Sequence, residues 1–95
     1  PRDSQQEART SLSYFYKGEE AKLQPYQKHL RRAILAHAQG DSREERRQYF
    51  LVLDLLDAVD VRDPANLNGL TGKQTGRGRS SDADLRALIE TLVTR

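Results

Sequence analysis

The sequence contains no cysteine, tryptophan or methionine. Without cysteine, a disulfide framework, a thiolate zinc site and a thiol nucleophile are all excluded. Long apolar runs are missing too: no stretch approaches the ~18 residues of a membrane span, and no signal peptide is recognisable. We therefore expect a cytoplasmic protein that does not enter the membrane. Because the chain starts at Pro1 and not at a methionine, we also expect a segment of a longer protein.

Catalytic and metal-binding motifs are equally scarce. There is no Gly-x-Ser-x-Gly motif and no histidine–carboxylate group that would converge on one point. His29 and His37 do not come together on a helix, and zinc would need further ligands that no motif supplies. We expect His37 to be buried and hydrogen-bonded in the core. A bundle this small should also leave little volume for a pocket of ~300 Å³ or more. The sequence therefore predicts no enzyme, no metal, no cofactor and no small-molecule substrate.

The residues that are present favour helices. Leucine dominates the large apolar residues, β-branched residues are few, and arginine, glutamine, glutamate and alanine occupy many polar positions. A chain of 95 residues suffices for one domain with a modest core. The 16 basic and 14 acidic residues give a net charge of +2, so the surface is nearly balanced in charge. We predict a single all-α domain over residues 1–95.

The segment 42–60 is the most hydrophobic part of the chain and predicts its central helix. Asp41 or Ser42 supplies the N-cap oxygen, and Glu44 and Glu45 follow in the first turn, where the helix dipole favours carboxylates. The apolar residues cover an arc of roughly 200°, so this helix should contact neighbours on two sides. They are Tyr49, Leu51, Val52, Leu53, Leu55, Leu56 and Val59.

Three further helices are expected to pack around it. A weaker N-terminal helix covers about 5–17, a second begins at Pro25 and ends near Ala38, and the last begins at Ser81 with Asp84 completing a capping box. The apolar residues expected to face inward are Ala8, Leu12, Phe15 and Tyr16 in the first helix, Leu23, Tyr26, Leu30, Ala33 and Ile34 in or next to the second, and Leu85, Leu88, Ile89, Leu92 and Val93 in the last.

The prediction is thus a small four-helix bundle around the helix 42–60, with three long helices and one weaker N-terminal helix. The second and central helices form an antiparallel αα-hairpin through the turn 39–41. Residues 71–80 form a glycine-rich basic loop, and residues 1–6 and 71–80 are expected to be flexible.

One narrow face of the central helix is charged and carries a single aromatic residue, Phe50. Either a loop or the N-terminal segment folds over Phe50, or the ring is an exposed anchor for a partner. The second alternative predicts a protein-interaction module that binds another protein or another domain of the same chain. Its partner-binding residues would be Arg46, Arg47, Phe50, Asp54 and Asp57.

The alternative is a nucleic-acid-binding accessory domain. Its phosphate contacts would come from the second helix and the loop 71–80, through Lys28, Arg31, Arg32, Lys73, Arg77 and Arg79. The acidic residues Asp54, Asp57, Asp60 and Asp63 spiral around the helix without converging, so they predict no metal site. Because they would repel nucleic acid from the central helix, we favour protein interaction.

Overall fold

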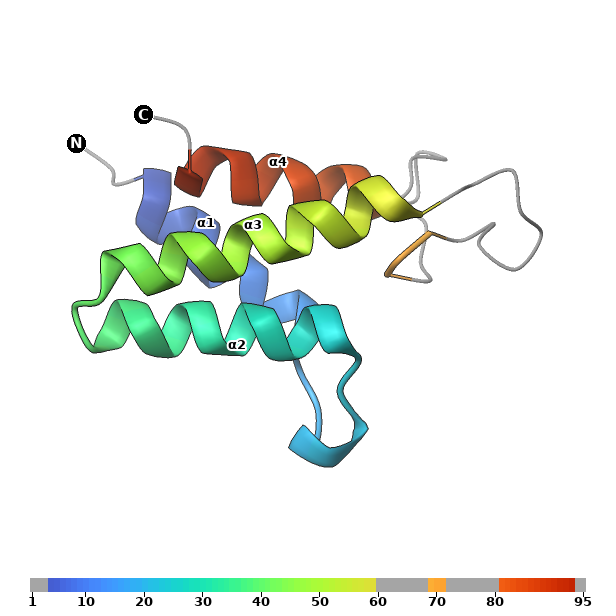
Figure 1. Cartoon of the computed structure of the whole chain (residues 1–95), viewed down its shortest axis with the longest axis horizontal. Coiled ribbons are helices and arrows are strands. Elements are labelled where there is room, and N and C mark those ends of the chain that lie inside the picture. Colours follow the sequence, from blue (N-terminus) through green and yellow to red (C-terminus); the bar gives the residue numbers. More distant parts are fainter. Residues whose placement is uncertain (1–3, 60–68, 72–80, 94–95) are drawn as a thin grey trace.

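Four α-helices and no strand make up the part of the chain that the computed structural model describes, residues 4–59, 69–71 and 81–93 (Figure 1). The all-α bundle predicted from the sequence is therefore confirmed. The basic loop lies almost entirely outside the described residues, and so do Asp60, Asp63, Lys73, Arg77 and Arg79. The helices are α1 (Ser4–Leu12), α2 (Pro25–Ala38), α3 (Ser42–Ala58) and α4 (Ser81–Val93).

The N-terminal helix is shorter than predicted. α1 ends at Leu12, and the chain continues through a 3-10 turn at Ser13–Phe15 and another at Glu20–Lys22. Ala8 and Leu12 are buried, whereas Phe15 and Tyr16 are half-buried against the core. The segment between α1 and α2 is therefore a connection whose first part is held to α2, while the turn at Glu20–Lys22 extends away from the bundle (Figure 1).

The hairpin of α2 and α3 follows the predicted boundaries closely. Gly40, with φ of +76°, ends α2 in a Schellman motif, in which the Gly40 N–H donates to His37 O at 3.0 Å and the Asp41 N–H to Ala36 O at 2.9 Å. Asp41 then caps α3, because its Oδ1 accepts from the Glu44 N–H at 3.1 Å. The turn thus satisfies the polar groups of both helix ends within three residues.

The core takes fully buried side chains from every helix, including Leu12, Leu30, Val52, Leu85 and Ile89. α3 packs against α2 on one side and α4 on the other, which Figure 1 shows as three neighbouring ribbons. The stripe predicted for α4 is confirmed, since Leu85, Ile89 and Leu92 are buried and Leu88 and Val93 are partly buried.

The buried face of α3 differs from the prediction. The helix ends at Ala58, and Leu51, Leu53, Leu55 and Val59 are only half-buried. Two polar residues, Glu45 and Gln48, are buried instead. The apolar arc is therefore narrower than the expected 200°, and polar contacts fill part of the interface between α3 and its neighbours.

The start of α4 is tied to the turn 69–71. The Asp82 carboxylate accepts from the backbone N–H groups of Leu70 at 2.7 Å and Thr71 at 2.9 Å. Gly69 lies directly against this carboxylate, which a Cβ at that position would meet, and its φ is +72°. Leu70 is partly buried and packs against the core. The capping box at Ser81 involves a side chain outside the described part.

Candidate interaction surfaces

A groove of about 530 Å³ opens on the outer face of α2, between this helix and the connection that follows α1. This volume is larger than expected, because a bundle this small was predicted to leave little volume for a pocket of ~300 Å³ or more. The volume is available because the groove is open to solvent and takes no space from the core. We call this surface the α2 groove. It is lined by Tyr16, Glu20, Lys28, Arg31, Arg32, Ile34, Leu35 and Ala38.

Apolar side chains line the inside of the α2 groove. Leu35 is 58% exposed, although leucine is usually buried in a folded domain. Tyr16 and Ile34 are half-buried, and both pack against the core. The groove therefore continues the hydrophobic core outward, and Leu35 is the part of it that water reaches most easily.

Arg31 builds one wall of the α2 groove. Its Nε donates to Tyr16 O at 3.2 Å and its Nη2 to Gly18 O at 2.7 Å, while Nη1 pairs with Glu20 Oε2 at 2.7 Å. The guanidinium carbon also lies 6.0 Å from the centre of the Tyr16 ring. Arg31 thus holds the connection against α2, so this predicted nucleic-acid contact is engaged within the chain.

Lys28 and Arg32 are the other basic residues of the groove. Lys28 is half-buried, Arg32 is exposed, and neither has an ion-pair partner among the described residues. The other three residues of the predicted nucleic-acid surface, Lys73, Arg77 and Arg79, lie outside the described part. On α2 itself, the groove therefore has two basic side chains that the described part of the chain leaves uncompensated.

The charged face of α3 is exposed, as predicted, and Phe50 is 46% exposed. No described segment folds over Phe50; instead the Arg46 guanidinium lies 5.6 Å from the ring centre. Arg46 Nη1 also donates to Val93 O at 2.8 Å, at the end of α4. Arg46 therefore links α3 to α4 and covers part of the ring.

Three further residues of the predicted stripe differ in how they are engaged. Asp57 forms an ion pair with Arg86 of α4, and Arg47 one with Glu44 at 2.8 Å. Asp54 is exposed. The stripe is thus a convex helix face on which most charges are balanced within the chain.

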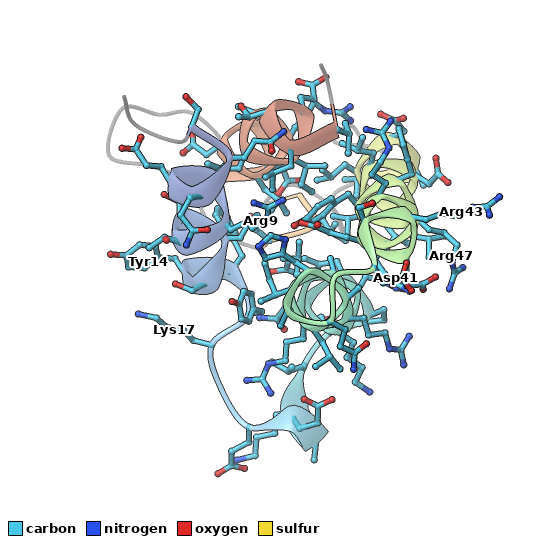
Figure 2. The ribbon with its side chains drawn as sticks, turned by 90° about the vertical axis from the view of Figure 1, so that its left-hand side faces the viewer. Arg9, Tyr14, Lys17, Asp41, Arg43 and Arg47 are labelled. Atoms are coloured by element: carbon cyan, nitrogen blue, oxygen red, sulfur yellow. The ribbon has the colours of Figure 1, made fainter. Side chains whose placement is uncertain are left out.

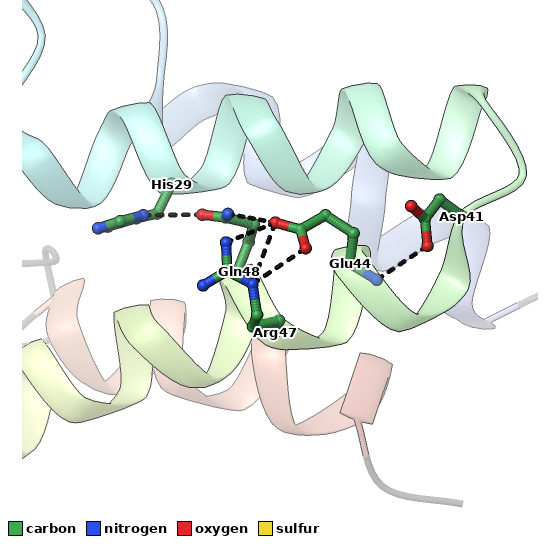
Figure 3. A network of polar contacts seen from close by, with 5 residues as sticks. All are labelled: His29, Asp41, Glu44, Arg47 and Gln48. Atoms are coloured by element: carbon green, nitrogen blue, oxygen red, sulfur yellow. Dashed lines mark hydrogen bonds and ion pairs between the residues drawn. The ribbon is translucent and has the colours of Figure 1, made fainter.

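Glu44 belongs to a polar network that joins α3 to α2 (Figure 3). Its carboxylate accepts from Arg47 and, at 2.8 Å, from Gln48 Nε2, and these hydrogen bonds lower the pKa of Glu44 to about 2. Gln48 Oε1 lies 2.8 Å from His29 Nδ1. Since an amide oxygen only accepts, His29 carries its proton on Nδ1 in this contact.

A second network surrounds the buried Glu45, where α1, α2 and α3 meet. Glu45 is 4% exposed, and its carboxylate accepts from Arg9 Nε at 2.8 Å and from the Tyr49 hydroxyl at 2.7 Å. His37 Nδ1 lies 3.3 Å from Oε1. Figure 2 shows Arg9 pointing into the bundle, whereas Arg43 and Arg47 point away from it. We call Glu45, Arg9, Tyr49 and His37 the Glu45 cluster.

This cluster corrects two expectations. His37 is exposed and reaches Glu45 from the edge of α2, so it is not a core residue. A histidine and a carboxylate also do come together, His37 and Glu45, which we did not expect. The sequence spacing of Arg9 and Glu45 also offered no signal, because these two residues are 36 positions apart. The one local clue was Glu45 four residues before Tyr49, which places both on one helix face.

The ionisation of the Glu45 cluster follows from its contacts. Burial alone raises the pKa of Glu45, but the hydrogen bonds from Arg9 and Tyr49 and the charges of Arg9 and His37 outweigh it and leave the pKa below its usual value. Burial and the bond to Glu45 raise the pKa of the Tyr49 hydroxyl. Glu45 is therefore held as an ionised acceptor and not as a group poised to exchange protons near neutral pH.

Among the residues described, no three histidine or carboxylate side chains gather as a metal site would require. None of the described helices combines the length and apolar character needed to cross a bilayer. Neither finding identifies a ligand.

In comparisons with protein-family models, curated proteins and solved structures, the chain matches no family, no curated protein and no solved structure.

Proposed function

We propose that this chain is a non-catalytic protein-interaction module and that the α2 groove is its binding surface. The observation that carries the proposal is Leu35, 58% exposed inside a groove of about 530 Å³. Exposed apolar surface that is rimmed by polar residues is typical of protein-interaction sites. The partner would be another protein or another domain of the same chain.

The α2 groove fits this role better than the Phe50 stripe does. A binding site needs surface that the fold itself leaves available. On the stripe, Arg46, Arg47 and Asp57 are engaged with Val93, Glu44 and Arg86. In the groove, Lys28 and Arg32 form no ion pair with any described residue, and Leu35 is exposed. The stripe stays a prediction for a second, weaker contact.

The non-catalytic part of the proposal rests on the Glu45 cluster, the most unusual group of titratable residues described. Both oxygens of Glu45 already accept: Oε2 from Arg9 and Tyr49, and Oε1 from Arg9 Nη2 at 3.3 Å, with His37 at the same distance. A carboxylate held in this way orients helices and has little capacity left for a substrate. The cluster therefore supports a structural role.

Nucleic-acid binding is the second candidate, favoured by the uncompensated Lys28 and Arg32. Each neutralised phosphate steepens the fall of affinity with salt. Since Arg31 is engaged with Glu20, α2 offers two phosphate contacts and not the expected three. An apolar side chain as exposed as Leu35 also contributes little to a phosphate footprint.

A capture experiment with two matched variants tests the proposal. The chain is immobilised and exposed to an extract of its own cells, with and without nuclease, beside Leu35→Glu and Phe50→Glu. We expect a defined protein that survives nuclease, is lost with Leu35→Glu and is kept with Phe50→Glu. Loss of every captured species after nuclease would end the protein-partner proposal. Loss with Phe50→Glu alone would move the site to α3.

A further inference from the structure

We infer that the α2 groove takes an acidic amphipathic helix, which lays apolar side chains on Leu35 and carboxylates beside Lys28 and Arg32. This inference rests on the proposed function and adds the chemistry of the partner. Three features of the groove support it: its charge, the spacing of its residues along α2, and its shape.

The charge of the groove selects an acidic partner. Among its lining residues, Glu20 is the single acid, and it is paired with Arg31 at 2.7 Å. Lys28 and Arg32 remain as two uncompensated positive charges beside an apolar surface. A basic segment would be repelled there, and a purely apolar one would leave both charges without a counterpart. A segment that carries both apolar and acidic side chains complements the groove.

The spacing of these residues favours a helical partner. Lys28, Arg32 and Leu35 lie four and three residues apart on α2, so they form one row along one face of the helix. The row is about 10 Å long at 1.5 Å per residue. Basic residues occupy its N-terminal part, and Leu35 its C-terminal part. A helix lying along this row would carry carboxylates on one turn and apolar residues on the next turns of the same face.

The shape of the groove fits such a side-on contact. Its wall is formed by the connection that Arg31 fixes through the carbonyls of Tyr16 and Gly18. Tyr16 and Ile34 continue the apolar surface next to Leu35. Because these residues are held by the core and by Arg31, the groove is preformed, and binding orders little of the chain itself.

The test uses a synthetic fluorescein-labelled helical peptide with leucines on two turns and glutamates on the next turn of the same face. A second peptide has lysines in place of the glutamates. Anisotropy titrations compare both peptides on the wild-type chain and on Lys28→Glu/Arg32→Glu. We expect the wild type to bind the glutamate peptide about tenfold more tightly than the lysine peptide, and the variant to reverse this preference.

Two controls distinguish this result from misfolding and from a general effect of net charge. Arg43→Glu changes the net charge as much as one charge reversal in the groove does, on a face of α3 that points away from the bundle, and it should keep the wild-type preference. Leu35→Glu should abolish binding of the glutamate peptide. A reversed preference in Lys28→Glu/Arg32→Glu itself requires a folded groove, so loss of structure cannot imitate it.

Other outcomes overturn the inference. Equal binding of both peptides, or of neither, would show that charge does not select the partner. Tighter binding of a labelled DNA duplex, lost in Lys28→Glu/Arg32→Glu, would assign the groove to nucleic acid. Self-association in sedimentation that Leu35→Glu removes would assign it to a second copy of the chain. If the peptides fail while the captured protein still depends on Leu35, the partner chemistry is wrong and the proposed function stands.

Discussion

The inner and outer faces of α2 differ in how completely their side chains are buried and paired. The inner face carries Tyr26, Leu30 and Ala33, all buried, and His29 reaches Gln48 on α3. No buried side-chain nitrogen or oxygen in the described part of the chain lacks a hydrogen-bond partner. The outer face leaves Leu35 in solvent beside two uncompensated cations.

Folding requires the inner face of α2 to be buried and paired, but it does not require the outer face to be so. Burying an unpaired polar group or leaving a cavity destabilises a domain, so the inner face is constrained by stability alone. An exposed leucine contributes little to stability. Stability therefore does not explain the exposed Leu35 of the outer face, whereas binding of a partner does. The predictions below contrast the two faces, starting with the largest effect.

Replacing Arg9 with methionine should have the largest effect on stability. It leaves the Glu45 carboxylate, 4% exposed, without its main counter-charge. We expect the free energy of unfolding in urea to fall by about 3–5 kcal/mol. Arg9→Met/Glu45→Gln should recover a large part of the loss, because the buried charge is then removed. A loss below about 1 kcal/mol in the single variant would show that Glu45 is not buried as described.

Leu30→Ala and Leu35→Ala compare the two faces directly. Leu30 is fully buried, so its truncation should lower the free energy of unfolding by about 2–5 kcal/mol. Leu35 is 58% exposed, and the same substitution there should change the free energy of unfolding by no more than about 0.5 kcal/mol. Similar losses in the two variants would mean that Leu35 belongs to the core and that the groove is closed.

The smallest effect concerns pH and the half-buried Glu44. Its folded-state pKa of about 2 lies below the ~4.3 of an unfolded glutamate. Its contribution to stability is therefore complete above pH ~4.3 and is lost as the pH falls toward ~2. In urea unfolding between pH 7 and pH 2, Glu44→Gln should lose less stability on acidification than the wild type does. An identical pH dependence would show that the contacts with Arg47 and Gln48 do not persist in solution.

The sequence predicted those features of the fold that are encoded locally. Pro25 at the start of α2, and Gly40 with Asp41 at the turn into α3, act through their own backbone and side-chain preferences, so the hairpin was found nearly to the residue. Glu45 was misread because a carboxylate in the first turn is already explained by the helix dipole. Its burial depends on Arg9, which no local pattern connects to it.

The candidate site was predictable only in part. The sequence predicted Lys28, Arg31 and Arg32 as a basic group on the second helix, and these residues now line the α2 groove. The groove itself was not predictable, because its wall depends on where the chain runs between α1 and α2. That path is fixed by the bonds from Arg31 to the carbonyls of Tyr16 and Gly18, and backbone carbonyls leave no signature in a sequence.

The most direct test is a map of amide chemical-shift changes in the labelled chain on addition of the glutamate peptide. The account predicts that the changes centre on Tyr16, Arg32 and Leu35, while the inner residue Leu30 changes little. Changes centred on Phe50 of α3, or distributed evenly over the bundle, would contradict it.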